Sequence, residues 1–438
     1  MPARLKHANG EDHFTPIALS EAELTCPIGS IPATDEQGRR FGKARVLVRL
    51  HTKPLGMIEF PSSESGFEPS SCARAIWEQM GDRINHHLRD DGLPPITGID
   101  PKGIAEAEAP ACLERRRKTL SRAPRASVIV CTRNRPDVLG RALSSLEHLE
   151  YPNYETLVID GSSNSESTDI VRTEFPYIRY VRLAGGGLVV GQNRGLAEAT
   201  GDIVAYTDDD AVVDRYWLAE HVAAFDDEGR VACTTGLAVP SELATPAQLW
   251  FEESGAFTQG FDRRVIDMAS RHRGSLLPWA TGKIGAGVSM AWRREALLEI
   301  GGFDLALDAC GAHDLAAFFD ALCAGYQIVF EPGALVHHEH RRTYDELRGQ
   351  IYSHAVGLSA YLTRCLVTHP NLALDFVRRV PEGVRYGFAP SSIRNEKKSP
   401  DFPSALTRVE WPGIAKGPWA YVKGRRGVDE RRAFQRPH

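Results

Sequence analysis

The sequence has no long hydrophobic run, no secretory leader and little imbalance of charge. No window reaches about eighteen uninterrupted apolar residues, so we expect no helix that crosses a bilayer. The N-terminus, MPARLKHANGEDHF, lacks the apolar stretch of a secretory signal, so we expect a cytoplasmic protein. The net charge of −5 over 438 residues argues against a protein built to coat nucleic acid.

Paired cysteines and internal repeats are also lacking. The eight cysteines are scattered singly and none forms a CxxC pair, so the sequence indicates reduced thiols rather than a disulfide framework or a zinc site. They are Cys26, Cys72, Cys112, Cys131, Cys233, Cys310, Cys323 and Cys365. The chain is long enough for two or three domains with a large core.

The central part of the chain, residues 121–342, alternates apolar strands with amphipathic helices. Such alternation with short connections predicts βαβ units and a mostly parallel, Rossmann-like sheet with flanking helices, which is an α/β fold. Right-handed crossovers would place the carboxyl ends of the parallel strands on one edge, where ligands of open α/β sheets bind.

The two flanking regions differ from this centre. Residues 1–120 predict a small α+β appendage: an irregular start to about residue 40, two short strands around a turn at Lys53–Gly56, and a helix over 71–89. The charged run Glu114–Lys118 indicates a linker. The remaining residues, 343–438, predict a helical extension that begins with a helix over 344–368 and ends in a loosely packed basic tail.

Three consecutive aspartates, Asp208, Asp209 and Asp210, follow the predicted strand IVAYT. Side chains alternate along an extended segment, so Asp208 and Asp210 share one face and Asp209 points the other way. Two carboxylates on one face repel each other unless a cation or hydrogen-bond donors compensate. Mg²⁺ or Mn²⁺, with oxygen ligands and a bridge to phosphates, fits this need. The alternative is a solvated turn, although Asp214 is the better cap for the following helix.

Polar residues after other predicted strands suit a nucleotide. Asp160 ends the strand TLVID and is placed to accept hydrogen bonds from a ribose or base, or to form a turn with Ser162. The segment TRNRP offers hydroxyl, amide and guanidinium groups at a helix start. Gly185–Gly191 does not have the GxGxxG spacing, so we interpret it as a lead into a helix that presents Asn193 near the pyrophosphate. The expected donor-binding set is Thr132, Arg133, Asn134, Arg135, Asp160, Ser162, Asn193, Asp208 and Asp209.

Two further segments carry titratable side chains. Asp314 opens a predicted helix, where it is either a cap or a general base that deprotonates an acceptor hydroxyl. His338 and His340 share a face at the end of the strand before Arg341, so one of them could complete the metal site, although a lone surface histidine is more often inert.

Taken together, these segments resemble glycosyltransferase family 2, with its GT-A fold. The matching segments are SVIVCTRNRPDVLGRALSSL, YETLVIDGSSN, GQNRGLAEATGDIVAYTDDDAVVD, SMAWRREALLEIGGFD, HDLAAFF and EPGALVHHEHRR. The resemblance implies a nucleotide-binding set of Thr132, Arg135 and Asp160. It implies that Asp208 lies near the ribose and diphosphate and that Asp210 ligates the metal. It further implies His338 as the second metal ligand and Asp314 as the catalytic base.

The chain departs from the family pattern at two positions in the expected acceptor region, which comprises Gly287, Ser289 and His313. His313 stands where the family usually has Glu, so the local charge differs while Asp314 remains. Ser289 stands where Asn is frequent, which puts acceptor contacts in doubt.

The resemblance implies a metal-dependent, inverting glycosyltransferase that uses Mn²⁺ or Mg²⁺ and a UDP-, GDP- or dTDP-sugar. The acceptor would be a glycan, a lipid-linked sugar or a small molecule, and a lipid-linked acceptor would bring the enzyme to a membrane surface. A sugar-phosphate nucleotidyltransferase and a non-catalytic nucleotide-sugar binding protein are the two alternatives. Pyrophosphate release from NTP and sugar phosphate would favour the first; metal-assisted donor binding without turnover would favour the second.

Overall fold

The computed structural model describes residues 14–61, 63–105, 109–226, 229–255, 257, 259–269, 276–389 and 392–434. A nine-stranded mixed sheet forms the centre, in the order β10-β12-β9-β11-β7-β4-β5-β6, with β8 paired to β12. Its strands are β4 (Ala126–Thr132), β5 (Tyr154–Asp160), β6 (Arg179–Arg182), β7 (Ile203–Asp208), β8 (Ala211–Val213), β9 (Val231–Pro240), β10 (Arg264–Ile266), β11 (Ser289–Arg293) and β12 (Gln327–His338).

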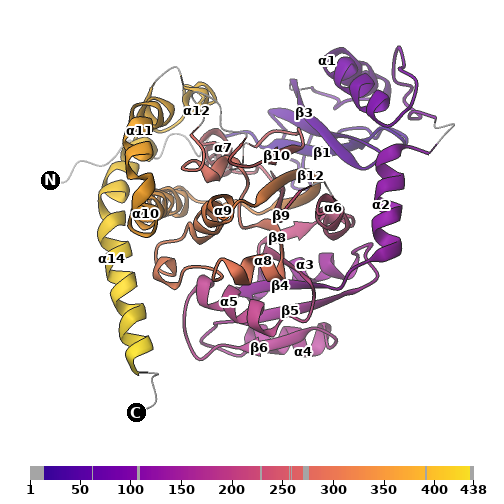
Figure 1. The fold of residues 1–438 in the computed structure, drawn as a ribbon. Coiled ribbons are helices and arrows are strands. Elements are labelled where there is room, and N and C mark those ends of the chain that lie inside the picture. The colour runs from indigo at the N-terminus through magenta and orange to yellow at the C-terminus, as the bar shows by residue number, and fades with distance from the viewer. Residues whose placement is uncertain are drawn as a thin grey trace.

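The first half of the sheet is parallel, as the alternating pattern predicted. Strands β6, β5, β4 and β7 run in one direction, while β11 is antiparallel to both β7 and β9. The carboxyl ends of β4, β5 and β7 therefore meet at one edge, with Thr132 opposite Asp160 in the register. The predicted α/β class with flanking helices is confirmed, but the sheet is mixed rather than mostly parallel, because β11, β10 and β8 pair with their neighbours in antiparallel fashion (Figure 1).

Helices cover both faces of the sheet because its strands are apolar on both sides. On β4, Val128 and Val130 pack on one face while Ile129 packs on the other. Helices α3 (Pro136–Glu147), α4 (Glu166–Glu174) and α6 (Trp217–Ala224) cover the first face. Helices α5 (Leu188–Glu198), α8 (Arg294–Glu299) and α9 (His313–Cys323) cover the second. The short elements α7 (Pro246–Glu253), η1 (Thr281–Lys283) and η2 (Leu305–Leu307) complete this part.

The N-terminal region forms a small sheet of β1 (Ile17–Glu23), β2 (Lys43–Leu50) and β3 (Lys53–Pro61), on which α1 (Pro69–Asp90) packs. The predicted irregular start was wrong for residues 17–23, which pair in parallel with β2, while residues 24–42 form turns and isolated bridges; residues 1–13 lie outside the described residues. The turn lies at His51–Thr52 rather than at Lys53–Gly56. Pro54 and Gly56 instead belong to β3, an edge strand, where proline is tolerated.

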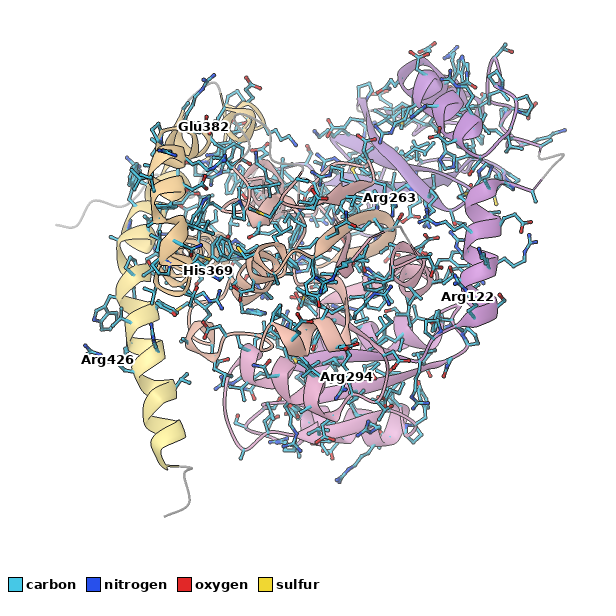
Figure 2. All side chains as sticks on the ribbon, in the orientation of Figure 1. Arg122, Arg263, Arg294, His369, Glu382 and Arg426 are labelled. Carbon is cyan, nitrogen blue, oxygen red and sulfur yellow. The ribbon has the colours of Figure 1, made fainter. Side chains whose placement is uncertain are left out.

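The charged run Glu114–Lys118 is part of helix α2 (Ala111–Arg122), not of a linker. Its Arg116 is buried and donates from Nε to Glu220 Oε1 of α6 at 2.7 Å. Lys53, at the start of β3, bonds to Glu220 and lies 3.1 Å from Glu331 Oε1 of β12. Arg263, labelled in Figure 2, donates to the other oxygen of Glu331 at 3.1 Å. Buried ion pairs thus join the N-terminal region to the central sheet.

The C-terminal region is helical to residue 434. It comprises α10 (Tyr344–Thr368), η3 (Pro370–Leu372), α11 (Ala373–Phe388), α12 (Ile393–Glu396), α13 (Ser404–Arg408) and α14 (Glu410–Phe434). The predicted loose tail was wrong for residues 410–434, because α14 packs along α10 (Figure 1); residues 435–438 lie outside the described residues. Gly413 and Gly417 permit this approach, since a side chain at either would meet the backbone of α10. Among the described residues, no helix has the length and apolarity to cross a membrane.

Candidate active site

Three potential metal ligands converge where β7 and β12 end. Asp208, Asp210 and His338 each offer a ligand atom, and these atoms lie within 4.8 Å of one another. His338 Nε2 is 3.4 Å from Asp210 Oδ1. The backbone brings the two segments together, because β8 pairs with the end of β12 and places His338 opposite Ala211. Two carboxylates and one imidazole suit a divalent cation.

Asp209 points away from this group, as strand alternation predicted. Its Oδ2 accepts a hydrogen bond from Thr132 Oγ1 at 2.8 Å, and its Oδ1 accepts one from Arg135 Nη1 at 2.6 Å. The second Arg135 nitrogen donates to Asp210 Oδ2 at 2.8 Å. The guanidinium of Arg135 therefore bridges two neighbouring aspartates and fixes the loop after β4 against the end of β7.

The acidic cluster carries an electrostatic cost. Burial, together with repulsion from Asp210, Asp209 and Asp314, raises the pKa of Asp208 to about 8. Burial likewise raises the pKa of Asp209 to about 6, although Arg135 opposes it. For Asp210 the attraction of His338 and Arg135 outweighs burial, and its pKa is lowered. Without a further positive charge the cluster favours a protonated Asp208, so a bound cation would relieve the repulsion.

A buried chain of hydrogen bonds lies behind His338. The Nδ1 atoms of His338 and His340 are 3.0 Å apart, and His340 Nε2 is 2.8 Å from Glu252 Oε1 of α7. Burial lowers the pKa of His338 to about 4, so its imidazole is neutral near pH 7. We assign the Nε2 proton of His340 to the bond with Glu252, which makes His340 Nδ1 the acceptor. His338 then donates from Nδ1 and keeps a lone pair on Nε2, toward Asp210.

Asp314 lies at the start of α9, close enough to Asp208 for the two carboxylates to repel. Its Oδ2 accepts a hydrogen bond from the backbone of Gly287 at 2.8 Å, and its Oδ1 accepts one from the backbone of Leu315 at 2.9 Å. The two residues predicted near the acceptor, Gly287 and Asp314, are therefore brought together. Each carboxylate oxygen retains a lone pair for a further partner.

The predicted nucleotide-binding loops after β4 and β5 are tied to each other. The backbone of Asn134 donates to Ser162 Oγ at 2.7 Å, and Asn134 Oδ1 accepts from the backbone of Ser163 at 2.8 Å. Asp160 is fully buried, and its oxygens accept bonds from the Ser162 backbone at 2.7 Å and Tyr180 Oη at 2.5 Å. Arg133 is exposed in the same loop. The carboxylate of Asp160 thus has a definite local role in shaping the loop.

Three predicted site residues have interior roles instead. Ser289 is not in contact with an acceptor, because it is fully buried and its Oγ bonds to Trp217, His221 and the Ala334 carbonyl. Asn193 is not presented to a pyrophosphate, because its amide exchanges two hydrogen bonds with the Phe303 backbone.

His313 is the third of these residues. It is 6% exposed and contacts Phe303 edge-on, and neither of its ring nitrogens has a hydrogen-bond partner among the described residues. Burial lowers its pKa, so it adds no charge beside Asp314 near neutral pH.

Sequence reasoning missed Asp308 as well as the support from His340 and Glu252. The carboxylate of Asp308 accepts bonds from the backbone of Gly187 at 2.8 Å, Val189 at 2.9 Å and Val190 at 3.3 Å. It therefore caps α5 from a distant segment. An acidic residue in the stretch GFDLALD was visible, but nothing in the sequence paired it with the glycine-rich lead of α5.

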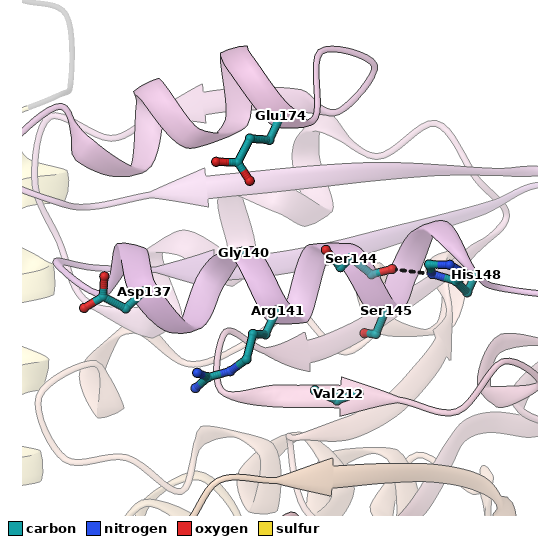
Figure 3. Close-up of a pocket in the computed structure, with 8 residues that line it drawn as sticks. All are labelled: Asp137, Gly140, Arg141, Ser144, Ser145, His148, Glu174 and Val212. Carbon is teal, nitrogen blue, oxygen red and sulfur yellow. Dashed lines mark hydrogen bonds between the residues drawn. The ribbon is translucent and has the colours of Figure 1, made fainter.

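A shallow depression of about 510 Å³ lies over the outer side of α3 (Figure 3). Its lining includes Asp137, Arg141, His148 and Glu174 but none of the strand-end residues described above. We place the candidate site at the strand ends rather than in this depression, because the potential ligand atoms converge there and the closely spaced carboxylates have shifted pKa values.

Comparisons with known proteins agree with the motifs. Residues 127–290 match the model of Glycosyl transferase family 2. The chain is 25% identical over 243 residues to the glucosyl-dolichyl phosphate glucuronosyltransferase of Haloferax volcanii, covering 51% of this chain and 72% of that protein. It is 30% identical over 223 residues to the succinoglycan biosynthesis protein ExoM of Rhizobium meliloti, covering 48% of this chain and 64% of that protein.

A third relative is the pre-mycofactocin glycosyltransferase of Mycobacterium tuberculosis, 27% identical over 216 residues, or 49% of this chain and 43% of that protein. Among solved structures, the mannosyltransferase PcManGT from Pyrobaculum calidifontis in complex with GDP-Man and Mn²⁺ is similar with a TM-score of 0.41 and 20% identity, covering 75% of this chain and 85% of that chain. The sequence alignments thus span about half of this chain.

Proposed function

We propose that the chain is a member of glycosyl transferase family 2, whose model matches residues 127–290, and that it moves a sugar from a nucleoside-diphosphate sugar to an acceptor hydroxyl, with inversion and with Mn²⁺ or Mg²⁺. The observation that carries this proposal is the convergence of Asp208, Asp210 and His338 at the sheet edge, with Asp314 close to Asp208. We assign catalysis to residues 121–342, with residues 1–120 and 343–438 as supporting regions.

The residues present fit a divalent cation. The raised pKa of Asp208, whose first cause is burial and second the repulsion from Asp210, is the expected state of a carboxylate pair that lacks its counterion. When bound, the ion would neutralise negative charge on the departing diphosphate. Arg341 Nη2, 3.8 Å from Asp210 Oδ2, adds positive charge on the same side.

We assign the nucleotide to the loops that follow β4 and β5. Arg133 is exposed there, and Arg135, which is held by two aspartates, keeps 31% of its side chain exposed. Guanidinium groups bind phosphate through paired hydrogen bonds. Thr132 and Asp160 act by holding these loops in shape, through Asp209 and Ser162 respectively.

Asp314 is assigned as the general base. The backbone bonds from Gly287 and Leu315 fix the orientation of its carboxylate, which a base needs to meet an acceptor hydroxyl. In a single displacement the acceptor oxygen bonds to the anomeric carbon as the bond from that carbon to the diphosphate breaks. The hydroxyl proton passes to Asp314, so the charges balance within one step.

The test compares Asp314→Asn and Asp210→Asn with Asp345→Asn, an exposed aspartate on α10. A panel of nucleotide sugars is first screened by thermal shift with and without Mn²⁺, because a true donor stabilises the fold in proportion to its affinity. D314N should keep the shift but lose about 10²- to 10⁴-fold in transfer or donor hydrolysis. D210N should lose the part of the shift that depends on Mn²⁺. Near wild-type turnover by D314N would contradict the base assignment.

We further propose that the C-terminal helices rest on a lipid surface. Helix α11 exposes four large apolar side chains at helical spacing: Leu374, Val377, Val380 and Val384, between 41% and 63% exposed. Trp411 and Trp419 of α14 are 56% and 61% exposed. Exposed apolar stripes with tryptophan and basic neighbours are typical of interfacial helices. Cosedimentation with anionic vesicles should fall in Val377→Asp and not in Glu382→Gln; equal binding by both would refute the assignment.

A further inference from the structure

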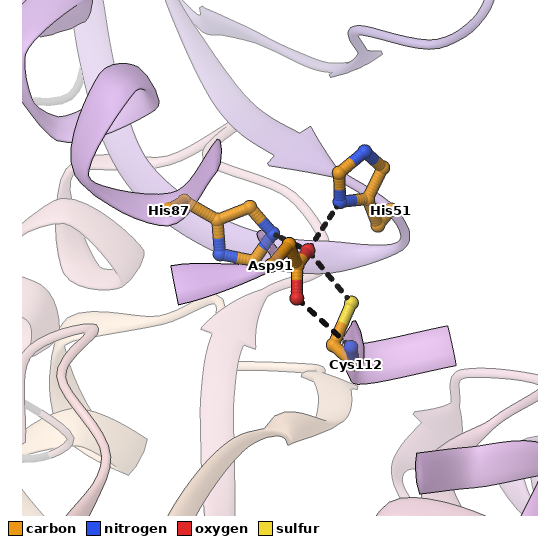
Figure 4. A group of neighbouring side chains, drawn as sticks. All are labelled: His51, His87, Asp91 and Cys112. Carbon is orange, nitrogen blue, oxygen red and sulfur yellow. Dashed lines mark hydrogen bonds and ion pairs between the residues drawn. The ribbon is translucent and has the colours of Figure 1, made fainter. Parts of the chain in front are cut away.

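Four side chains of metal-binding type meet in the N-terminal region, far in sequence from the acidic cluster. They are His51, His87, Asp91 and Cys112, and one ligand atom of each lies within 4.8 Å of the others (Figure 4). His51 is in the turn between β2 and β3, His87 and Asp91 are at the end of α1, and Cys112 is the second residue of α2. Three separate segments of the chain therefore contribute.

Asp91 is at the centre of this group. Its Oδ2 lies 2.5 Å from His51 Nδ1, 3.2 Å from His87 Nε2 and 3.0 Å from Cys112 Sγ. The cluster is largely shielded from solvent, since the side chains of His51, His87 and Asp91 are 0%, 17% and 5% exposed. A thiol, two imidazoles and a carboxylate thus share one small buried volume.

We propose that His51, His87, Asp91 and Cys112 bind one Zn²⁺ as a closed structural site. Cysteine, histidine and aspartate are all zinc ligands, and four protein ligands in tetrahedral geometry leave no open position, as in structural zinc sites. One thiolate and one carboxylate would balance the double positive charge of the ion. Zinc–ligand bonds of about 2.0–2.3 Å place tetrahedral ligands roughly 3.4–3.7 Å apart, so the four atoms need move by only about 1 Å.

The backbone around the cluster supports this assignment. The turn that carries His51 has only two residues, and both have left-handed backbones, with φ of 54° at His51 and 67° at Thr52. Such turns favour Asn and Gly, and a histidine there costs conformational energy that a metal bond would offset. Cys112 lies in the first turn of α2, and its backbone N–H donates to Asp91 Oδ1 at 2.8 Å, which holds the carboxylate beside the thiol.

The cluster lies beside the contact between the N-terminal region and the central sheet. Thr52, next to His51, accepts a hydrogen bond from Arg116 of α2 at 2.6 Å, and the following Lys53 reaches Glu220 and Glu331. An ion that ties the turn to α1 and α2 would hold Lys53 in place. The proposed site departs from the expectation of no zinc site, which rested on the lack of paired cysteines.

The alternative is a hydrogen-bonded cluster without metal, in which Asp91 accepts from both imidazoles, the thiol and the Cys112 backbone. The zinc site and the metal-free cluster predict different metal contents for the purified protein. Full-length protein is purified without chelating resin, and zinc is measured by elemental analysis for the wild type, H87A and C112S. The matched controls are H86A, whose exposed imidazole is the neighbour of His87 on α1, and C26S, an exposed cysteine.

We expect one zinc ion per chain in the wild type, H86A, C26S and D210N, and its loss in H87A and C112S. Retention in D210N separates this ion from the one proposed at the active site. Because the ligand variants could fail to fold, the wild type is also loaded with Co²⁺, whose thiolate charge-transfer band should appear and be displaced by Zn²⁺. A wild type without zinc and without that band, or zinc retained in both H87A and C112S, would overturn the site.

Discussion

Replacing His340 by Phe tests whether the buried hydrogen-bond chain sets the ligand atom of His338. His340 is 2% exposed and packs against Phe251, with ring centroids 4.5 Å apart, so a phenyl ring fits the same space. The substitution removes the acceptor for His338 Nδ1, which is 3.0 Å away, and leaves Glu252 without its imidazole partner. The fold should survive while the protonation of His338 changes.

The expected effect on Mn²⁺ affinity follows from the two tautomers that remain available to His338. If the ring keeps its proton on Nδ1, a buried donor is unsatisfied, at a cost of about 1–3 kcal/mol. If the proton moves to Nε2, the lone pair that faces Asp210 is lost. At about 1.4 kcal/mol per tenfold, the first state alone weakens Mn²⁺ binding by roughly 5- to 150-fold. Loss of partners behind metal-ligating histidines typically costs about 10- to 100-fold, in the same range.

The assay is an equilibrium titration with Mn²⁺, in which the concentration of free Mn²⁺ is measured by electron paramagnetic resonance. The control is His337→Phe, since His337 is the neighbour of His338 on β12 but pairs with Glu21 at 3.0 Å instead. H340F should raise the dissociation constant by at least fivefold, and H337F should leave it unchanged. An H340F protein that melts like the wild type and binds Mn²⁺ equally well would refute the role of the chain.

Three further outcomes follow from packing and charge. Lys53→Met should lower the free energy of unfolding by about 3–5 kcal/mol in urea titrations, because Glu220 and Glu331 lose a buried partner; an unchanged midpoint would contradict this. Burial alone would raise the pKa of Glu331, but Lys53 and two arginines lower it from 4.5 to about 2. Between pH 4.5 and 2 the unfolded state therefore binds more protons than the folded state, so the free energy of unfolding should fall as the pH falls through this range. The fall should be less steep in K53M. Gly417→Val should cost about 1–3 kcal/mol, since its Cβ would lie 2.5 Å from a backbone oxygen of α10. Gly427→Val on the same helix should cost less, because a Cβ there comes within 4 Å of no atom of the described residues.

The strands and the three aspartates at the end of β7 could be predicted because both depend on local sequence patterns. Alternation of apolar strands with helices marks β4 to β7, and the two-residue period of an extended chain separates Asp209 from Asp208 and Asp210. Asp314 was expected to be the base and Gly287 to lie in the acceptor region, but the hydrogen bond that joins them was not predicted. The resemblance to a glycosyltransferase family came from the order of several motifs along the chain, and the family model matches residues 127–290.

The remainder depends on contacts between distant segments. Helix α14 contains Pro418 and several glycines, which disfavour a helix locally, yet its close packing on α10 stabilises it. Ser289 carries a hydroxyl that suits an acceptor, but Trp217 and His221 cover it from α6. Strand β1 alternates imperfectly, and its pairing comes from β2 and from a single bridge between Ile17 and Leu243.

The N-terminal region supports the candidate site through charge. Arg45 of β2 lies 3.5 Å from Glu252, the residue that orients His340, and Arg49 donates to Asp214 at 2.8 Å just after β8. Lys53 pairs with Glu331 on β12, the strand that ends in His338. Each of these carboxylates is at least partly buried. Without the lysine or arginine that pairs with it, the carboxylate would have to move toward solvent or become protonated. Either change would shift the backbone that carries His338. The hairpin of β2 and β3 is therefore part of the structure that positions the proposed metal ligands Asp210 and His338.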